Sequence, residues 1–276
     1  MYDITASIVL YNNNLKTLKL AINSFLDTDL NIRLYLIDNS PKDDLGKHFI
    51  NNNRIEYIFN DANLGFGKAH NIILLKSSNI SKYHLVLNPD VYFEGAILKN
   101  LFQFMERNKT VGHLMPKVLY PDGSVQYLCK LLPRPLDLIS RLAIPFDTRW
   151  KKKFDLRFFD YDKEINIPFL SGCFMFLRSD IINEVGGFDE NFFMYYEDAD
   201  LTRRIHANYK TWFYPHAVIW HEFNKESFRN IKLMLIQIKS AIYYFNKYGW
   251  IFDYERVRIN KKALKEIEKL KESIRD

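Results

Sequence analysis

The chain has 276 residues, of which 47% are hydrophobic and 26% charged, so it can bury a sizeable core and is too apolar to be disordered. No apolar stretch reaches the roughly 18 residues needed to span a bilayer. The opening residues also lack the basic segment of a signal peptide. We expect Cys129 and Cys173 to be free thiols in a reducing cytoplasm, although one disulfide is compatible with the count.

Charge is concentrated near the end of the sequence. Residues 225–276 carry 13 Lys and Arg against 7 Asp and Glu, an excess equal to the net charge of +6 of the whole chain. Such a basic segment suits an anionic partner, namely a membrane surface, a lipid pyrophosphate or a nucleic acid. The alternative interpretation is a solvated helical face.

The first 90 residues alternate between strand and helix patterns. Strands are expected at 6–11, 33–38, 54–59 and 84–90, and helices at 15–26 and 63–78. This alternation predicts a parallel sheet with right-handed crossovers. Ligands of such sheets bind beyond the carboxyl ends of the strands. The polar segments 11–14, 38–40 and 88–90 are therefore expected to converge there.

The second half of the chain is less regular. The pattern predicts an amphipathic helix at 95–108, a hairpin at 117–128 and a long irregular excursion at 130–166. A strand, a short helix, a loop and a new helix are expected across 167–205. From Phe228 onward the pattern is helical, with one apolar face made of Ile231, Leu235, Ile238, Ile242 and Phe245.

Two acidic positions carry the chemistry. Asp90 follows a buried strand in a turn, where a carboxylate can hold a divalent cation, although turns also use Asp routinely. Glu197, Asp198 and Asp200 are bunched at a predicted helix start. Bunched acids can merely complement the helix dipole, but they also raise one another's pKa values, which suits general-base work.

In order along the chain, the motifs "NLGFGKAHN", "LNPDV" and "GGFDENFFMYYEDADLTRR" resemble glycosyltransferase family 2, and most closely its bacterial rhamnosyltransferase-like members. The resemblance runs over roughly residues 5 to 227. It implies a GT-A fold, which is Rossmann-like α/β with a mostly parallel central sheet flanked by helices. It also implies a nucleotide-binding half at 1–90 and an acceptor or catalytic half at 91–227. Residues 228–276 would form a C-terminal basic helical extension.

The resemblance assigns a metal site and a catalytic site. Asp90 matches the last acid of the family's metal-binding motif, and Asn88 replaces its first acid, which weakens the case for strict metal dependence. His221 matches a histidine that can complete a Mg²⁺ or Mn²⁺ site, with a packing histidine as the alternative. Asp198 matches the catalytic base, and Glu197 is expected to orient it or the acceptor.

The donor-binding residues implied by the resemblance come from several strand ends and loops. Asp38 would read the base edge beside Tyr11, and Lys68 would touch phosphate. Asn63 and Gly65 would let the backbone approach the donor, or only start a helix. The full predicted set is Tyr11, Asp38, Asn63, Gly65, Lys68, Asn88 and Gly172.

The predicted function is inverting transfer of a sugar, L-rhamnose from dTDP-rhamnose, to a saccharide or polyprenyl-pyrophosphate-linked acceptor. The alternatives are the same chemistry with another UDP- or dTDP-sugar, or a non-catalytic nucleotide-sugar-binding scaffold. No nucleic-acid motif accompanies the basic segment, so a nucleic-acid partner is not expected. A cytoplasmic protein, peripheral on the inner face of the cell membrane, is the expected location.

Overall fold

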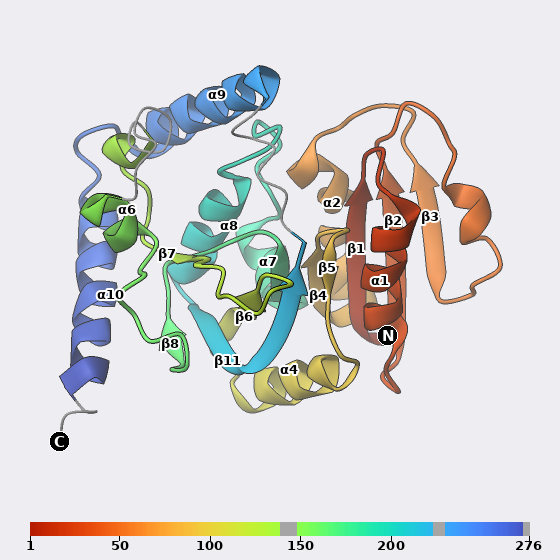
Figure 1. Ribbon diagram of the computed structural model, residues 1–276, viewed down its shortest axis with the longest axis horizontal. Coiled ribbons are helices and arrows are strands. Elements are labelled where there is room, and N and C mark those ends of the chain that lie inside the picture. Colours follow the sequence, from red (N-terminus) through yellow and green to blue (C-terminus); the bar gives the residue numbers. More distant parts are fainter. Residues whose placement is uncertain (139–147, 223–229, 273–276) are drawn as a thin grey trace.

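The computed structural model describes residues 1–138, 148–222 and 230–272 (Figure 1). Within these residues a nine-stranded sheet has the order β3-β2-β1-β4-β10-β6-β11-β5, with β8 pairing to β11. The strands of this sheet are β1 (Tyr2–Leu10), β2 (Ile32–Asp38), β3 (Ile55–Phe59), β4 (Ser81–Leu87), β5 (Val91–Tyr92), β6 (Val111–Leu119), β8 (Ile165–Asn166), β10 (Phe174–Arg178) and β11 (Lys210–His221). A separate pair is formed by β7 (Cys129–Lys130) and β9 (Phe169–Leu170).

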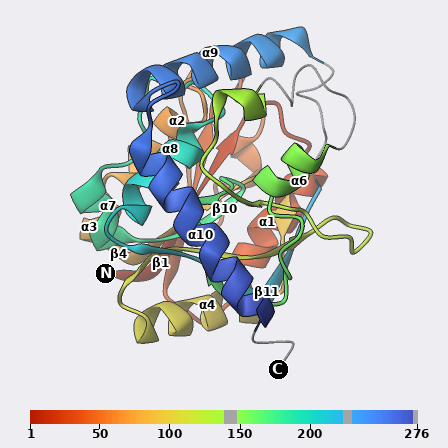
Figure 2. The same cartoon turned by 90° about the vertical axis from the view of Figure 1, so that its left-hand side faces the viewer.

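Helices cover the sheet and extend beyond it (Figures 1 and 2). They are α1 (Leu15–Leu26), α2 (Phe66–Leu74), α3 (Ser77–Ile80), α4 (Ala96–Arg107), α6 (Arg149–Phe154), α7 (Ser179–Val185), α8 (Glu197–His206), α9 (Ile231–Tyr248) and α10 (Tyr254–Glu272), with the 3₁₀ turn η1 (Gly46–His48). In Figure 2, α10 crosses the face of the molecule that turns toward the viewer, and α9 lies across one end.

The first four strands confirm the predicted parallel arrangement. β1 pairs in parallel with β2 and with β4, and β2 pairs in parallel with β3. Asn14 starts α1 because its side chain accepts hydrogen bonds from the amides of Lys16 and Thr17. The ends of β1 and β2 meet as expected, since the Asn12 amide donates to Ser40 Oγ at 2.8 Å.

The second half of the sheet adds antiparallel pairing. β10 lies between β4 and β6 and is antiparallel to both, whereas β6 and β11 are parallel. The predicted α/β class with a mostly parallel sheet, flanking helices and C-terminal helices is confirmed. The predicted inner face of α4 is also correct, because Ile97, Leu98, Leu101 and Met105 are its buried residues.

Strand β11 was not predicted from the pattern, although it is long and forms the far side of the sheet. Pro215 lies within it, and a proline removes one ladder hydrogen bond. The pairing with β6 shifts register between Tyr214 and Val218, so the irregularity falls where the proline lies. The predicted hairpin at 117–128 is correct in its turn, but its second arm reduces to one bridge between Leu119 and Val125.

The predicted C-terminal helices are present, but the expected apolar face of α9 is split. Phe245 is fully buried, whereas Ile231, Leu235 and Ile242 are exposed. The buried residues of α9 are Gln237, Ser240, Ala241, Tyr244 and Phe245. The predicted boundary between residues 227 and 228 lies outside the described residues, as does the middle of the 130–166 excursion.

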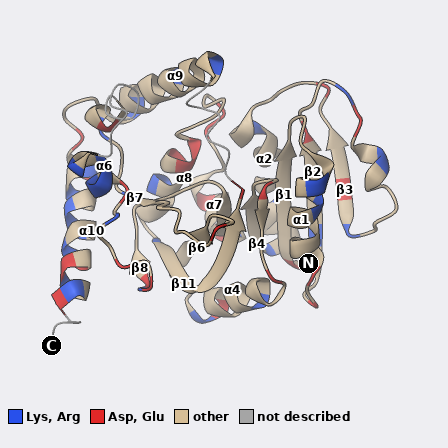
Figure 3. Ribbon diagram, viewed as in Figure 1, with Lys and Arg blue, Asp and Glu red and all other residues tan. Residues whose placement is uncertain are grey.

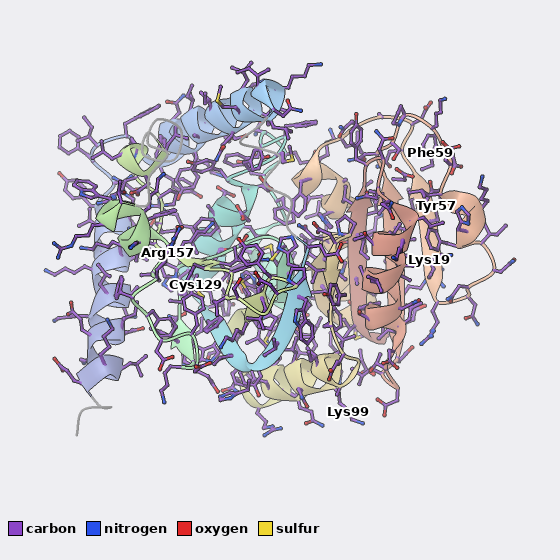
Figure 4. All side chains as sticks on the ribbon, viewed as in Figure 1. Lys19, Tyr57, Phe59, Lys99, Cys129 and Arg157 are labelled. Atoms are coloured by element: carbon purple, nitrogen blue, oxygen red, sulfur yellow. The ribbon has the colours of Figure 1, made fainter. Side chains whose placement is uncertain are left out.

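Both cysteines are buried free thiols, as predicted. Figure 4 shows Cys129 and Arg157 on the side of the molecule that carries α10, with Tyr57 and Phe59 of β3 on the other side. None of the helices in the described ranges has the length and apolarity that crossing a bilayer requires.

Candidate active site

The end of β2 places Asp38 in the interior. Asp38 is fully buried, and its two oxygens accept hydrogen bonds from the Ser40 amide at 2.7 Å and the Tyr57 hydroxyl at 2.6 Å. Burial, with this hydrogen bond second, raises the pKa of Tyr57 above its ordinary value. Tyr11 lies exposed at the end of β1. A base edge would therefore have to share an Asp38 oxygen with one of its present partners.

The glycine loop before α2 makes its close contacts with the polypeptide itself. Gly65 has φ +82°, and a Cβ there would lie 2.2 Å from the Phe193 carbonyl oxygen. A Cβ on Gly67 would lie 2.7 Å from Phe188 Cβ. Asn63 Oδ1 accepts a hydrogen bond from the Gly65 amide at 3.1 Å, which holds the turn. These glycines thus let α2 pack against the segment that precedes the acidic helix α8.

Lys68 joins the same two regions. Its ammonium lies 3.5 Å from Glu190 Oε2, and both side chains are about half exposed. An exposed pair of this kind contributes little stability and separates easily. Lys68 therefore remains able to reach a phosphate group.

Asp90 and His221 form the first acidic centre, across the short antiparallel pair of β5 and β11. His221 lies opposite Val91 in the register, and the Asp90 carbonyl accepts a hydrogen bond from the Glu222 amide at 2.9 Å. His221 Nε2 lies 3.4 Å from Asp90 Oδ1, which is longer than an ordinary hydrogen bond. Gln126, which the sequence did not single out, fixes the ring because its Oε1 lies 3.0 Å from His221 Nδ1.

The surroundings of His221 favour positive charge. Burial lowers the pKa of His221, but the neighbouring Cys173 and Asp90 outweigh it and raise the pKa to about 10. A carboxylate oxygen and a deprotonated imidazole nitrogen that face each other fit a divalent cation that takes its other ligands from elsewhere, so His221 would have to release its proton for a cation to bind. No cluster of three or more protein ligands occurs among the described residues. A donor diphosphate and water would have to complete the coordination.

Glu197 and Asp198 form the second acidic centre, at the start of α8. Asp198 Oδ2 accepts a hydrogen bond from the Gly172 amide at 2.9 Å, and Oδ1 accepts one from the Ala199 amide at 2.9 Å. Glu197 is buried, and its Oε2 has no hydrogen-bond partner among the described residues. Gly172 lies directly against the acid, since a Cβ there would be 3.1 Å from Asp198 Cβ.

Both carboxyl groups have pKa values above their ordinary range. Burial is the main cause for Glu197, followed by the charge of Asp198. Burial also raises the pKa of Asp198, while the ammonium of Lys130 and the Gly172 amide oppose that rise. Lys130 is a site residue that the sequence did not reveal, because it lies far from Asp198 along the chain. Each of the two carboxyl groups therefore holds its proton more tightly than an ordinary carboxyl group does.

The turn before α8 has an unusual backbone. Tyr195 and Tyr196 have φ values of 70° and 69°, in the left-handed region that non-glycine residues rarely adopt. Two adjacent residues of this kind are costly, and they occur directly before Glu197. Strain of this sort is common where a functional group has to be aimed.

Helix α9 holds this turn from outside. The Ser240 hydroxyl donates to the Met194 carbonyl at 2.8 Å. The Tyr196 ring contacts the rings of Tyr244 and Phe245 at centroid distances of 5.4 and 6.1 Å. The residues that hold the turn before α8 therefore come from a segment for which the sequence predicted no site residues.

A second set of contacts ties α9 to the acidic helix itself. Lys247 Nζ and the Tyr248 hydroxyl lie 2.6 and 2.7 Å from Asp200 Oδ1. Arg204 Nε pairs with Asp200 Oδ2 at 2.9 Å. Asp200 is thus fully engaged in structure, in contrast to Glu197.

The two acidic centres are connected through residues 172–173. The Gly172 amide binds Asp198, and the adjacent Cys173 carbonyl accepts a hydrogen bond from the Asn88 amide at 2.9 Å. The predicted residues Asn88, Asp90, Gly172, Glu197, Asp198 and His221 are thereby gathered around one short segment. Asp38, Tyr11 and the 63–68 loop flank it from β1, β2 and α2.

A curled α/β sheet with acids beyond its strand ends and at a following helix defines the class of GT-A glycosyltransferases. Residues 5–186 match the family model described as Glycosyl transferase family 2. The chain belongs to this family.

Two curated relatives from Mycobacterium tuberculosis strains are named N-acetylglucosaminyl-diphospho-decaprenol L-rhamnosyltransferase. Each is 29% identical over 173 residues, which is 58% of this chain and 56% of the relative. The chain thus aligns with about half the length of the curated relatives it matches.

Solved structures share the fold. GalNAc-T7 with UDP, GalNAc and Mn²⁺ has a TM-score of 0.62 at 15% identity, covering 82% of this chain and 44% of that one. S. aureus TarS 1–349 has a TM-score of 0.58 at 17% identity, covering 95% and 70%. TarS 1–349 with UDP-GlcNAc gives 0.59 at 15% identity, covering 95% and 71%.

Proposed function

We propose that the protein is an inverting glycosyltransferase that moves L-rhamnose from dTDP-rhamnose to a hydroxyl of a lipid-linked or growing cell-surface polysaccharide. The observation that carries the chemistry is the link between the two acidic centres through Gly172 and Cys173. It brings a carboxyl group with a raised pKa near a carboxylate and imidazole pair suited to a cation. The choice of sugar and acceptor rests on the mycobacterial relatives, whose name specifies L-rhamnose and a diphospho-decaprenol carrier.

Asp198 is proposed as the general base. Its carboxylate takes the proton of the acceptor hydroxyl while that oxygen bonds to the anomeric carbon of the sugar. The bond from that carbon to the diphosphate oxygen breaks, and the nucleoside diphosphate leaves with the electron pair. Attack from the face opposite the leaving group inverts the anomeric centre. Glu197, buried next to Asp198, is proposed to orient Asp198 or the acceptor.

Asp90 and His221 are proposed to hold a Mg²⁺ or Mn²⁺ ion. Such an ion, when bound, offsets the negative charge that develops on the leaving diphosphate. Asn88 supplies no charge at this centre, so the two side chains give the ion one formal negative charge. Tyr11 and Asp38 are proposed to bind the nucleotide base, Asn63 and Gly65 to shape the donor loop, and Lys68 to contact phosphate. Gly172 is proposed to leave room for the sugar beside Asp198.

The test is a screen of donor hydrolysis and transfer with dTDP-rhamnose, UDP-glucose and UDP-GlcNAc, in Mg²⁺, Mn²⁺ or chelator. A polyprenyl pyrophosphate-linked saccharide serves as the acceptor, and Asp198→Asn is the matched control. Turnover of dTDP-rhamnose in a metal, lost in the variant, supports the proposal. Turnover of a UDP-sugar alone would change the donor, and nucleotide binding without turnover of any donor would indicate a non-catalytic scaffold.

A peripheral position on the inner face of the cell membrane is proposed for the protein, since the acceptor of the relatives is lipid-linked by name. Four exposed lysines of α10 provide positive charge for an anionic surface: Lys261, Lys262, Lys265 and Lys269. Their replacement with Gln is expected to reduce sedimentation with anionic vesicles without unfolding the protein. Unchanged sedimentation would leave α10 as a solvated helix.

A further inference from the structure

The connection between α9 and α10 exposes large apolar side chains in an almost continuous run. Ile251, Phe252 and Tyr254 are 77%, 76% and 78% exposed, and Trp250 is 42% exposed. We call these four residues the aromatic tip. Single exposed apolar residues are ordinary, but a contiguous group of this size usually marks an interaction site.

The aromatic tip is held outward by its anchors. Asp253, inside the connection, is buried and accepts two hydrogen bonds from the Arg203 guanidinium of α8 at 2.7 and 2.8 Å. The Trp250 ring packs on Phe245 at 5.2 Å, and its Nε1 donates to Asn246 Oδ1 at 2.8 Å. Since both flanks of the connection are fixed in this way, Ile251 and Phe252 cannot fold back onto the core.

A row of positive charge continues from the aromatic tip along α10. Tyr254, Arg258, Lys261 and Lys265 follow one another at spacings of four, three and four residues, so they share one face of the helix. The side chains of this row lie on the outer side of α10. We call Arg258, Lys261 and Lys265 the basic stripe. The opposite face is buried and contains Arg256, Ile259, Ala263 and Ile267.

The acids of α10 leave the stripe uncompensated near the tip. Glu255 is engaged by Arg203 at 2.8 Å. Glu266, Glu268 and Glu272 lie toward the far end of the helix. Figure 3 shows Lys and Arg along α10, and a further group on the neighbouring α6, with Asp and Glu near the C-terminal part of α10.

We propose that the aromatic tip inserts into the interface of an anionic lipid bilayer while the basic stripe binds its headgroups. Aromatic side chains favour the depth of lipid headgroups, and exposed Lys and Arg are drawn to anionic lipids. Each basic residue close to such a surface strengthens binding roughly five-fold. An aromatic cluster followed by a one-sided cationic helix matches this surface in both apolarity and charge.

The tip also has a defined relation to the active site. Trp250 packs on Phe245, and Phe245 contacts Tyr196, which directly precedes Glu197 and Asp198. If the tip inserts, Trp250 and Phe245 would connect the lipid to Tyr196, in the turn before Glu197 and Asp198. The membrane location rests on the proposed function, and the aromatic tip and basic stripe are the residues proposed to make the contact. Vesicle binding is measured without the transfer reaction, so failure of one does not decide the other.

The first test measures insertion directly. Phe252→Cys is labelled with an environment-sensitive fluorophore, which is selective because Cys129 and Cys173 are buried. Ile50→Cys is the matched control, since Ile50 is 75% exposed and lies next to η1 in the donor half. Vesicles of phosphatidylglycerol should shift the emission of the probe at 252 to the blue, and brominated lipid should quench it. An equal response at 50, or none at 252, would overturn the proposal.

The second test separates the tip from the stripe. Ile251→Ser with Phe252→Ser, and Arg258→Gln with Lys261→Gln and Lys265→Gln, should each weaken vesicle binding at least ten-fold at low salt. Only the first pair should lower the binding that survives high salt, because screening removes the electrostatic part.

Matched controls carry Ile50→Ser with Leu75→Ser, or Lys16→Gln, Lys42→Gln and Lys47→Gln, at exposed positions outside α9 and α10. Thermal unfolding of every variant checks that the fold is intact. Equal losses in the controls would contradict a defined insertion surface. Self-association of the wild type without lipid, abolished by the Ile251 and Phe252 changes, would assign the tip to a second copy of the chain.

Discussion

The Gly172 amide binds Asp198, and Asp90 lies two residues after Asn88, whose amide binds the Cys173 carbonyl, but the surroundings of the two acids differ. Asp90 is partly exposed, follows a regular strand and faces an imidazole. Asp198 follows two left-handed tyrosines, lies next to the buried acid Glu197 and is held by two backbone amides. The imidazole that faces Asp90 has a raised pKa and so favours positive charge, whereas burial works against the ionised form of Asp198.

These surroundings suit Asp90 to cation binding and Asp198 to proton transfer. A carboxylate that reaches solvent suits a hard cation. A carboxyl group whose pKa is raised above its ordinary value takes a proton more effectively, because its ionised form is the stronger base. Of the two centres, the one at Asp198 has the left-handed backbone before it and the support of α9, which fits a group whose oxygen has to be oriented.

We expect the largest loss of transfer activity from a change at Asp198. Asp198→Asn should lower transfer by about 10²–10⁴-fold, the range for loss of a general base, while donor binding and folding persist. Asp180→Asn is the matched control, since Asp180 also lies in the first turn of a helix but is exposed. Transfer by Asp198→Asn within a few-fold of wild type would remove the residue from this role.

At the centre formed by Asp90 and His221, the affinity lost on mutation should depend on the presence of a divalent metal ion. Asp90→Ala should weaken binding of the nucleoside diphosphate in Mg²⁺ or Mn²⁺ more than in chelator, by at least the roughly 10–100-fold seen when metal sites lose a supporting group. Calorimetry with dTDP in both conditions measures this. Equal losses would make Asp90 structural, and full wild-type activity in chelator would mean that the Asn88 replacement has made the enzyme independent of metal.

Substitution of Lys130 tests the raised pKa of Asp198, because it should shift the pH dependence of kcat. Transfer needs ionised Asp198, so kcat should rise as pH rises through the pKa of the Glu197 and Asp198 pair. The Lys130 ammonium holds that pKa down against burial, hence Lys130→Met should move the acid limb of the profile to higher pH. Lys130→Arg keeps the charge and should leave the limb in place. A uniform drop in kcat with an unmoved limb would make Lys130 merely structural.

The contribution of Glu197 to stability should fall as pH rises, whereas an acid with a lowered pKa contributes more at higher pH. Its pKa is raised in the folded protein, so the fold binds a proton more tightly than the unfolded chain does. That contribution to stability is present below the unfolded pKa and is lost as pH rises through the folded pKa. Glu197→Gln should therefore raise the melting temperature at pH 8 by about 2–4 °C, the equivalent of roughly 1 kcal/mol. The gain should disappear at pH 4, and a variant that is less stable at both pH values would contradict the assignment.

The sequence predicted the first half well because buried strands and amphipathic helices alternate there with clear periods. Asp90, Asp198 and His221 were predicted as site residues through ordered motifs. Their supports were not, because Gln126, Lys130 and Ser240 reach the site only through tertiary contacts. Strand β11 was missed because Pro215 interrupts an aromatic-rich pattern that has no simple period.

Helix α9 shows the limit most clearly. The predicted apolar face includes Ile231 and Ile242, which are exposed, whereas the buried face contains the polar residues Gln237 and Ser240. Hydrophobic patterns place polar residues outside, and only the carbonyl of Met194 explains why Ser240 is buried. The burial of Ser240, which donates to the Met194 carbonyl, therefore could not be predicted from the spacing of hydrophobic residues.

The smallest expected effect tests whether the left-handed turn is strained. Tyr195→Gly and Tyr195→Ala both remove the same ring, so the cost of removing the ring is the same in the two variants. Glycine adopts φ near +70° without penalty, whereas alanine is destabilised by about 1–2 kcal/mol in the left-handed region. Tyr195→Gly should therefore be more stable than Tyr195→Ala by roughly 1 kcal/mol in chemical denaturation, the reverse of their usual order in regular structure. The same pair at Lys19, an exposed position in the interior of helix α1, is the control and should favour alanine. If alanine is the more stable at 195 as well, the turn relaxes at little cost. The contrast between a strained centre at Asp198 and a relaxed one at Asp90 would then rest on burial alone.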